Sequence, residues 1–534
     1  MSIRKNKREE GLAKRRAGAN GPQLNNFTSP TPTPAVGDAA TTPAAAPSKH
    51  TYTVEDIPAL WSGLQAADPA MQLESLKGFR RVLSIEPKPP VLEVLNIGAL
   101  PAFVSFLTNS TSPEMQFEAA WALTNVASTE YTRVVVEHGA LPSLCQMLAS
   151  PNANVREQCA WCLGNIAGDC PDLRDAVLQA GALVPILQNV MQPASVSMLR
   201  NVVWALSNFC RGKPQPKLDV IGPAVGVLAQ SLMHEDKEVV MDCCWALSYV
   251  SDGDNDRVEA VVQSGVVPRL VQLLGHESAA VVTPALRTAG NIVSGSDSQT
   301  QAVVDAGALE AMTPLLQHAK KGIRREACWV LSNVAAGSKT QIDALMLHPQ
   351  IMEGVLEHMR NSEWEVKKEA AWVMSNIATG GSSDQVLGLL QRHDVVRPMC
   401  GLLDCSDVKI INVALDALEA LLKVSDKSHG AVNVGVQIDE CDGLEKLENL
   451  QEHKNESIYN KVVRIIETHF GDDGEDEAEN VAPGLSGDGQ AFAFNANAFG
   501  GKTMDAGNGA AIIPAPTQPF SFNAQSFNFN AQTN

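Results

Sequence analysis

A short phrase recurs through the middle of this chain at a nearly constant interval. Each copy begins with Gly and continues with small and apolar residues, often with a nearby Pro, and successive copies are 41, 42, 41, 43 and 42 residues apart. A period of ~40–47 residues means that one supersecondary unit is copied along the chain, so unrelated globular domains or one large core do not explain its 534 residues. The glycines that mark the copies are Gly98, Gly139, Gly181, Gly222, Gly265 and Gly307.

The Gly and Pro residues predict where helices end and begin. Gly closes a helix in the left-handed conformation, and Pro opens the next helix at its first turn. Leu, Val and Ala supply most of the apolar residues, so each unit is predicted to hold one short and two longer amphipathic helices. This period and punctuation are typical of armadillo and HEAT repeats, which stack into an elongated all-α superhelix with a long concave surface.

Weaker copies extend the array in both directions. Residues 57–84 form a first repeat, residues 396–423 a ninth, and residues 442–470 a terminal one. The terminal copy is rich in Glu, Lys, Asn and His, as a solvent-facing cap requires. About ten repeats are therefore predicted over residues 54–470.

The segments on either side of the array are predicted to be disordered. Residues 21–53 are rich in Pro, Thr and Ala and form a linker whose random-coil span is on the order of 30–35 Å, so that residues 1–20 can reach the array. Residues 471–534 begin with an acidic run and continue as a Gly-, Ala- and Asn-rich tail. The phenylalanines of this tail are Phe492, Phe494, Phe499, Phe520, Phe522, Phe527 and Phe529.

Charge is distributed unevenly along the chain. Residues 1–20 carry seven Lys or Arg against two Glu, whereas the whole chain has a net charge of −19. An acidic body repels nucleic-acid phosphates and attracts Lys- and Arg-rich partners. We therefore expect basic proteins as partners and no direct contact with nucleic acid.

Several other classes of protein find no support in the sequence. No apolar run reaches the ~18 residues of a membrane-spanning helix, and the first residues are too charged for a signal peptide, so we expect a soluble protein that is not secreted. The eleven cysteines lack disulfide spacing, and Cys159 and Cys162 are better explained by core packing than by metal binding, because no second pair accompanies them. No catalytic or phosphate-binding motif stands out, so we expect neither enzyme activity nor a cofactor or metal.

The last helix of successive repeats carries a Trp that is followed four residues later by an Asn. Positions i and i+4 lie on one helical face, so each pair places an indole beside an amide. One such pair would be ordinary packing, but five in one register are not, because Asn is unfavourable inside a helix unless it finds a partner outside it. These pairs, which we call the ladder, are Trp121/Asn125, Trp161/Asn165, Trp204/Asn208, Trp329/Asn333 and Trp372/Asn376.

An extended peptide is the partner that fits the ladder. The Asn amide offers a donor and an acceptor to any peptide backbone, and neighbouring indoles form slots for the aliphatic stems of Lys and Arg. Packed helices lie ~8–10 Å apart and two residues of an extended chain span ~6.8 Å, so successive repeats can engage roughly alternate side chains. Acidic residues beside the ladder would then select basic peptides.

The motifs of the last helices also resemble those of a known family. WALTN, WCLGNIAGD, WALSNFCRG, WALSYVSDG, LRTAGNIVSG, CWVLSNVAAG and AWVMSNIATGG, in this order, resemble importin-α, and the resemblance covers nearly the whole chain. It implies a right-handed armadillo-repeat solenoid that serves as a nuclear import adaptor. Such an adaptor binds mono- and bipartite basic nuclear localisation signals in its groove, links them to importin-β, and shuttles between cytoplasm and nucleus through the nuclear pore.

The resemblance assigns two peptide sites, separated where the ladder lapses at Trp245/Tyr249 and Arg287/Asn291. The major site lies in the second to fourth repeats and the minor site in the seventh and eighth. Asp169 matches the acid that selects a key lysine and Thr132 its hydroxyl partner, although the loop before Thr132 is two residues shorter than in the family. The major-site residues are Trp121, Asn125, Thr132, Trp161, Asn165, Asp169, Trp204, Asn208, Asp242 and Trp245. The minor-site residues are Arg287, Asn291, Glu326, Trp329, Asn333, Glu369, Trp372 and Asn376.

Residues 3–16 resemble the second half of the family's importin-β-binding helix. The first half, which carries an Arg cluster, is not recognisable, so a reduced affinity for importin-β is expected. The run 14–16 keeps the part that mimics a localisation signal, which implies self-inhibition; the alternative is a disordered basic tail. The basic residues of the segment are Arg4, Lys5, Lys7, Arg8, Lys14, Arg15 and Arg16.

The other end of the chain suggests further partners. The terminal repeat resembles the surface on which a CAS-type recycling exportin docks with Ran-GTP, and the acidic run 472–479 would assist it. The F-x-F pairs of the tail suggest nucleoporin-like contacts. The alternative class is a catenin-type armadillo scaffold that binds acidic tails, but its groove would be lined with Lys and Arg, whereas this chain is strongly acidic.

Overall fold

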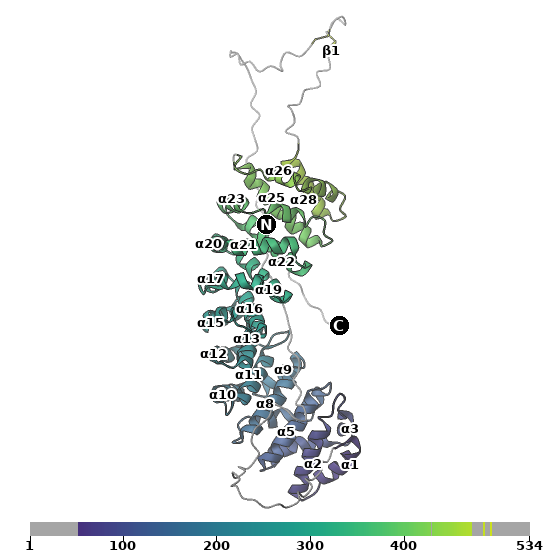
Figure 1. Cartoon of the computed structure of the whole chain (residues 1–534). Helices are drawn as coiled ribbons and strands as arrows, with labels where there is room; N and C mark the ends of the chain where they lie inside the picture. Colours follow the sequence, from purple (N-terminus) through teal and green to yellow (C-terminus); the bar gives the residue numbers. More distant parts are fainter. Residues whose placement is uncertain (1–51, 429, 472–483, 486–491, 494–534) are drawn as a thin grey trace, which may run out of the picture. The chain divides into compact units, whose positions relative to one another are not determined.

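Groups of two or three helices follow one another along residues 52–470 of the computed structural model (Figure 1). The structure describes residues 52–428, 430–471, 484–485 and 492–493. Ten such groups confirm the predicted array of about ten armadillo-type repeats. The last helices of the repeats are α2 (Pro69–Val82), α5 (Pro113–Ala127), α8 (Ala153–Ala167), α11 (Val196–Cys210), α13 (Lys237–Ser251), α16 (Ala279–Val293), α19 (Lys321–Ala335), α22 (Trp364–Gly380), α25 (Val408–Asp426) and α28 (Glu456–His469).

A second helix precedes the last helix in every repeat, and a first helical element precedes that in nine of the ten. The first element is shorter than the second helix in five of these nine repeats and at least as long in the other four, so the predicted pattern of one short and two longer helices holds only in part. The second helices are α1 (Ile57–Leu64), α4 (Ala99–Asn109), α7 (Ala140–Met147), α10 (Leu183–Met191), α12 (Leu218–Ser231), α15 (Val267–Leu274), α18 (Ala308–Leu316), α21 (Pro349–Asn361), α24 (Val396–Cys400) and α27 (Gly443–Leu450). The first elements are the 3-10 helix η1 (Val54–Asp56), α3 (Val91–Asn96), α6 (Thr132–Glu137), α9 (Pro171–Gln179), α14 (Asn255–Gln263), α17 (Asp297–Asp305), α20 (Lys339–Met346), α23 (Ser383–Arg392) and α26 (Val434–Asp439).

The repeats stack because each last helix packs against the last helices of its two neighbours. Figure 1 shows α8, α11, α13, α16, α19 and α22 following one another in this way, with the second helices α10, α12 and α15 beside them. The buried Leu, Val, Ile and Ala residues of successive repeats form one cluster that runs from Ile57 to Ile465. A repeat that could not bury its apolar face alone is therefore completed by its neighbours.

The predicted glycine turns are confirmed at five of the six positions and wrong at the sixth. The five glycines have left-handed φ values between 74° and 84°, which a Cβ would strain: Gly98, Gly139, Gly181, Gly265 and Gly307. Gly222 instead lies inside α12. The fifth repeat has no separate first helix, because residues 211–217 contain Gly212, Pro214 and Pro216, and Gly222 has no preceding helix to close.

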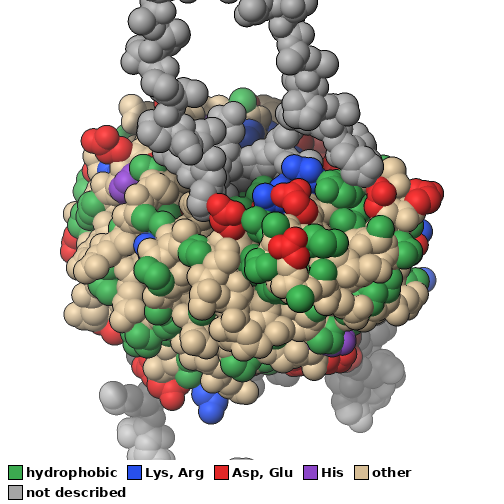
Figure 2. Space-filling view, turned by 90° about the horizontal axis from the view of Figure 1, so that it is seen from below, with side chains coloured by type: hydrophobic (Ala, Val, Ile, Leu, Met, Phe, Trp, Pro, Cys, Tyr) green, Lys and Arg blue, Asp and Glu red, His purple; other side chains and the backbone are tan. Residues whose placement is uncertain are grey.

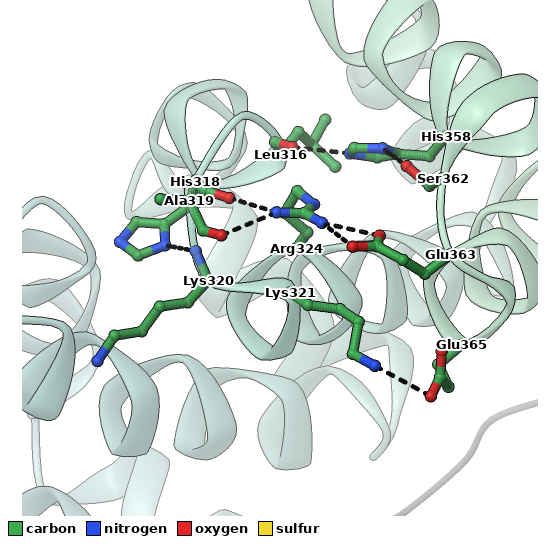
Figure 3. Close-up of polar contacts among 10 residues, drawn as sticks. All are labelled: Leu316, His318, Ala319, Lys320, Lys321, Arg324, His358, Ser362, Glu363 and Glu365. Atoms are coloured by element: carbon green, nitrogen blue, oxygen red, sulfur yellow. Dashed lines mark hydrogen bonds and ion pairs between the residues drawn. The ribbon is translucent and has the colours of Figure 1, made fainter.

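Polar contacts at one edge of the array tie neighbouring repeats together (Figure 3). Arg324 on α19 donates from Nη2 to both carboxylate oxygens of Glu363, the N-cap of α22, at 2.8 Å. His358 on α21 donates from Nε2 to the Leu316 carbonyl at 2.7 Å, and its Nδ1 lies 2.7 Å from the Ser362 hydroxyl. Burial lowers the pKa of His358, so the folded protein favours the neutral ring.

Figure 2 looks at one end of the array and shows more acidic than basic side chains on that face. They are separated by apolar and neutral side chains rather than gathered in one patch. This view agrees in sign with the net charge of −19.

The segments outside the array are described only in small part. The predicted basic segment 1–20 and nearly all of the linker 21–53 lie outside the described residues, as does most of the segment 471–534. Within the latter, the short strands β1 (Gly484–Leu485) and β2 (Phe492–Ala493) pair in antiparallel register. This pair lies in a segment for which we expected no regular structure.

Candidate peptide-binding site

The ladder asparagines are buried, and most of them are anchored to the repeat before their own. The five asparagines of the ladder, and Asn291 in the same register where the ladder lapses, are each no more than 1% exposed. For five of these asparagines, a hydrogen-bond partner outside their own helix is found in the preceding repeat. In each case it includes a backbone carbonyl. From Nδ2, Asn165 donates to the Thr124 carbonyl at 3.4 Å, Asn208 to Gly164 at 3.1 Å, Asn291 to Ser248 at 2.9 Å and Asn376 to Ser332 at 2.7 Å. Asn125 donates to the Arg80 carbonyl at 3.3 Å and to the Ser84 hydroxyl at 2.9 Å.

Anchoring the nitrogen leaves the amide oxygen available. In Asn125, Asn165, Asn208 and Asn291 the buried Oδ1 accepts no hydrogen bond from any described residue. A buried acceptor without a donor costs about 1–3 kcal/mol, so four such oxygens in one register are a marked feature of this surface. An array of oriented acceptors is suited to the N–H groups of an extended chain.

The indoles of the ladder pack along the repeats as well as within them. Trp161 and Trp204 form an apolar cluster with Ala205, and Trp121 packs against it. The residue three positions after each ladder Trp, and after Arg287, is small, and at Gly164 and Gly290 the next repeat's indole lies against it. At Gly164 an added Cβ would lie 2.6 Å from the Trp204 ring, and at Gly290 it would lie 2.0 Å from the Trp329 ring.

Asp169 and Thr132 lie in the turns that follow two successive last helices. Asp169 is exposed between α8 and α9. Its neighbour Gly168 lies against the ladder, since a Cβ there would be 3.1 Å from Asn208 Nδ2. The Thr132 hydroxyl is fully buried and lies 2.7 Å from the Thr129 carbonyl, so in this structure it supports the shortened loop.

The ladder changes at the next two repeats, as the sequence indicated. On α13 the rings of Trp245 and Tyr249 stack, with centroids 5.9 Å apart and an angle of 22° between the planes. Asp242, three residues before Trp245, is fully buried on the same helix. Arg287 takes the Trp position of α16 and donates from Nε to Glu326 at 2.9 Å.

Glu326 is balanced by two arginines. Arg287 and Arg325 contact its two oxygens at 2.9 and 3.0 Å, and the Arg287 guanidinium lies 6.0 Å from the Trp329 ring centroid. The Arg287–Glu326 pair is nearly inaccessible, with side chains 4% and 3% exposed. An acid that was predicted to attract a peptide cation is thus engaged by cations of the chain itself.

Glu369 and Trp372 lie beside a cavity of about 720 Å³ between α22 and α25. From α25 the cavity is lined by Asn412 and Asp416, among others. Lys461 contacts Asp416 at 2.6 Å, so part of the acidic charge is neutralised here too. The structure therefore places the last predicted minor-site pair at an open cavity.

Several polar side chains that the motifs did not indicate connect the ladder helices. Gln158 donates to the Thr124 hydroxyl at 2.8 Å, and Asn201 donates to Glu157 at 2.7 Å. Burial raises the pKa of Glu157. The signal that could have found them is the position three residues before each Trp, which also carries Glu118, Asp242, Glu326 and Glu369.

Arg80 is the least expected of these residues. It lies on α2, donates from Nε to Glu118 at 2.6 Å, and stacks over Trp121 with its guanidinium carbon 4.4 Å from the ring centroid. Extending the Trp register by one period upstream would have indicated it.

The remaining sequence expectations concern cysteines, metals and membranes. Cys159 and Cys162 are fully buried on α8, and burial raises the pKa of Cys162 to about 12. All eleven cysteines are free thiols. Within the described ranges, we find no group of three or more His, Cys, Asp or Glu side chains able to hold a metal ion, and no helix long and apolar enough to cross a membrane. The basic residues predicted between Arg4 and Arg16 lie outside those ranges.

Comparisons with known proteins agree with the armadillo-type repeat. Residues 433–484 match the family described as Atypical Arm repeat. The Armadillo/beta-catenin-like repeat matches residues 87–128, 128–168, 170–211, 254–294 and 296–336.

Among curated relatives, the chain is 50% identical over 523 residues to importin subunit alpha-2 of Arabidopsis thaliana, covering 96% of this chain and 93% of that protein. It is 44% identical over 449 residues to importin subunit alpha-1b of Oryza sativa subsp. japonica, covering 83% of each. It is 43% identical over 493 residues to importin subunit alpha-B of Dictyostelium discoideum, covering 91% and 92%. Among solved structures, an engineered protein superposes with a TM-score of 0.71 at 27% identity, covering 77% of this chain and 98% of that chain.

Proposed function

Since the chain belongs to the importin α family of non-enzymatic nuclear import adaptors, we propose that its ladder binds basic nuclear localisation signals and that the chain links them to importin-β. The observation that carries the proposal is the row of anchored asparagines. With Nδ2 held by the preceding repeat, the Oδ1 atoms of Asn125, Asn165, Asn208 and Asn291 are oriented and lack a donor among the described residues. Backbone N–H groups of an extended peptide would supply those donors whatever its side chains are.

Selection of basic side chains follows from the indoles and the charge. The Trp121, Trp161 and Trp204 rings pack into one apolar cluster, and the slots beside them would take the stems of Lys and Arg. Asp169 is exposed in the turn whose Gly168 lies against Asn208, and a carboxylate there favours a peptide cation. The net charge of −19 would raise the association rate of basic ligands.

Two sites are proposed on the same array. The major site uses the residues from Trp121 to Trp245, including Thr132 and Asp242. The minor site uses those from Arg287 to Asn376, including Glu326 and Glu369. A signal with two basic clusters would occupy both, and a signal with one cluster would favour the major site because the Glu326 charge is already engaged by Arg287 and Arg325.

The proposed transport cycle needs further partners. Residues 3–16 would bind importin-β and, when it is absent, compete with cargo for the ladder. The terminal repeats around α27 and α28 would bind a CAS-type exportin with Ran-GTP, and the Phe-containing tail would contact nucleoporins. Shuttling between cytoplasm and nucleus through the pore follows from this cycle.

A matched pair of asparagine variants tests the ladder. Asn165 and Asn189 are both buried, and each donates to a backbone carbonyl 41 residues earlier, but only Asn165 belongs to the ladder. We expect Asn165→Ala to weaken binding of a labelled Lys/Arg-rich peptide about tenfold and Asn189→Ala to change it less than about twofold, measured by fluorescence anisotropy. Equal effects of the two substitutions would show that the ladder Asn acts only through stability.

A shortened chain tests the self-inhibition. If residues 1–20 compete with cargo, the protein that begins near residue 50 should bind the peptide more tightly than the full chain. Equal affinities would rule out competition and leave the ladder assignment intact. If neither protein binds the peptide, the ladder assignment itself is wrong.

A further inference from the structure

Arg80 occupies the position of the first repeat at which later repeats carry Trp. It lies on α2, 41 residues before Trp121 and four residues before Ser84. Ser84 takes the place of the ladder Asn, and its hydroxyl accepts the hydrogen bond from Asn125 Nδ2 at 2.9 Å. The first repeat therefore adds one position to the ladder, with Arg in place of Trp.

The Arg80 side chain makes the contacts that a ligand arginine would make. Its Nε and Nη2 lie 2.6 and 3.5 Å from the two carboxylate oxygens of Glu118. Its guanidinium carbon lies 4.4 Å from the ring centroid of Trp121, within cation–π range. The Arg80 and Glu118 side chains are 11% and 9% exposed, so this pair is partly shielded from water.

The same arrangement recurs five repeats later. Arg287 is the other arginine in the Trp register, and it contacts the next repeat's Glu326 at 2.9 Å and lies 6.0 Å from the Trp329 ring. In both cases the acid precedes its Trp by three residues and the arginine comes from the repeat before. The recurrence indicates a defined role rather than an incidental surface ion pair.

The acid and the ring that Arg80 contacts have the spacing of a proposed cation slot. Glu118 and Trp121 are three residues apart on α5, as Glu369 and Trp372 are on α22. We infer that Arg80 is an internal ligand that fills the slot at Trp121 and thereby sets the end of the peptide-binding site. The inference rests on the proposed function, and it makes Arg80 a specificity-determining residue, since a longer basic cluster gains nothing at this end.

A purely structural role for Arg80 predicts something different. As a brace between α2 and α5, its loss would destabilise both repeats and weaken all peptides alike. The backbone carbonyl of Arg80, which accepts from Asn125, is kept in any substitution, so the ladder contact itself survives. Comparing peptides of different length therefore separates the two roles.

The experiment compares the full-length protein with its Arg80→Ala variant, using fluorescence anisotropy and labelled peptides. The peptides are a core of consecutive Lys and Arg residues, the core extended by Ala-Arg at its amino end, and the core extended by Arg-Ala at its carboxyl end. In Arg80→Ala, one extended peptide should bind about tenfold more tightly than the core, because its arginine pairs with Glu118 over Trp121. In the unmodified protein neither extension should change the affinity by more than about twofold.

Two further variants guard against trivial outcomes. The double variant Arg80→Ala with Glu118→Gln should lose the gain, because the acid is removed. Arg80→Gln keeps an aliphatic stem for packing and should show the same end-specific gain if Arg80→Ala proves unstable.

Equal gains in affinity from the two extensions would reflect bulk charge and overturn the inference, as would no gain from either. If the unmodified protein binds none of the peptides, the proposed function fails before the role of Arg80 is at issue.

Discussion

Two parts of the ladder, repeats 3 and 4 and repeats 7 and 8, use different chemistry at the same geometric position, three residues before the Trp. In repeats 3 and 4 that position holds the amides Gln158 and Asn201, which donate to the Thr124 hydroxyl and to Glu157 of the preceding repeat. In repeats 7 and 8 it holds Glu326 and Glu369. Glu326 is neutralised by Arg287 from the preceding repeat. The negative charge that is available to a ligand thus depends on which acids are already paired with basic residues of the chain, and not on the number of acids.

A second difference lies at the edge where second and last helices meet. In the N-terminal half, Asn189 on α10 donates to the Leu148 carbonyl at 3.0 Å. In the C-terminal half, His358 on α21 donates to the Leu316 carbonyl at 2.7 Å (Figure 3). The contact is the same, but of the two side chains only the imidazole can gain or lose a proton in the mildly acidic to neutral range that proteins commonly meet. The two halves can therefore be compared in three ways: by adding a Cβ under a ladder indole, by neutralising an acid, and by lowering the pH.

The largest effect is expected from filling the glycines under the indoles. Gly290→Ala should destabilise the protein by about 3 kcal/mol and Gly164→Ala by about 2 kcal/mol, because the new Cβ would overlap the buried rings of Trp329 and Trp204. The measurement is urea unfolding followed by circular dichroism. Gly222→Ala is the control, since its Cβ meets no atom within 4 Å inside α12, and it should be neutral or slightly stabilising. A smaller loss for Gly290→Ala than for Gly164→Ala would contradict the closer packing at Trp329.

A smaller effect is expected from neutralising one acid in each half. Asp169→Asn should weaken binding of a bipartite basic peptide about tenfold, because an exposed carboxylate beside the ladder is lost. Glu326→Gln should weaken it less than about threefold, because two arginines already balance that charge.

The control for these two acids is Asp172→Asn, which removes one charge close to Asp169 but on α9. It should leave the affinity nearly unchanged. If Glu326→Gln weakened binding as much as Asp169→Asn, the ion pairs with Arg287 and Arg325 would not reduce the contribution of Glu326 to peptide affinity.

The smallest effect is expected from pH. Since burial lowers the pKa of His358, the unfolded chain takes up a proton more readily than the folded one, and stability should fall as pH drops below the ordinary histidine pKa of about 6.5. Above that pH the contribution is constant. His358→Asn, which copies Asn189, should flatten the dependence of the unfolding free energy on pH between neutral and mildly acidic conditions.

The reverse exchange completes this test. Asn189→His should introduce an acid-dependent loss into the N-terminal half. His393, whose pKa burial also lowers, is unchanged in every variant and cancels in the comparison. An unchanged slope in His358→Asn would mean that other groups govern the acid response.

Much of the array could be predicted because its signals are local and repeated. The glycine period gave the repeat count, and the Trp/Asn spacing gave the face, since both follow from helix geometry. Gly222 was misassigned because its Gly-Pro pair looks like the other turns, while the prolines before it remove the helix that it would have closed. The Gly-Pro motif alone does not indicate whether a helix precedes it.

The site was predicted less completely, because partners across repeats are not visible in a helical pattern. Arg80 is an ordinary basic residue in its own helix and becomes part of the ladder only through Glu118 and Trp121, which come from the next repeat. Likewise, the sequence predicted that Glu326 shares a helix face with Trp329 but could not indicate that Arg287 neutralises it. Which charges remain for a ligand is decided by contacts some 40 residues apart.

The anchoring of the ladder amides gives the surface a direction. A side-chain amide that was free to rotate by 180° could present either its oxygen or its nitrogen to a ligand. Such an amide would not distinguish the two directions of a bound peptide. Here the nitrogens of Asn165, Asn208, Asn291 and Asn376 all bond toward the preceding repeat, and turning one over would set its oxygen against a carbonyl. The ladder therefore distinguishes the two directions in which an extended peptide could bind, so that a peptide and the same sequence in reverse are different ligands.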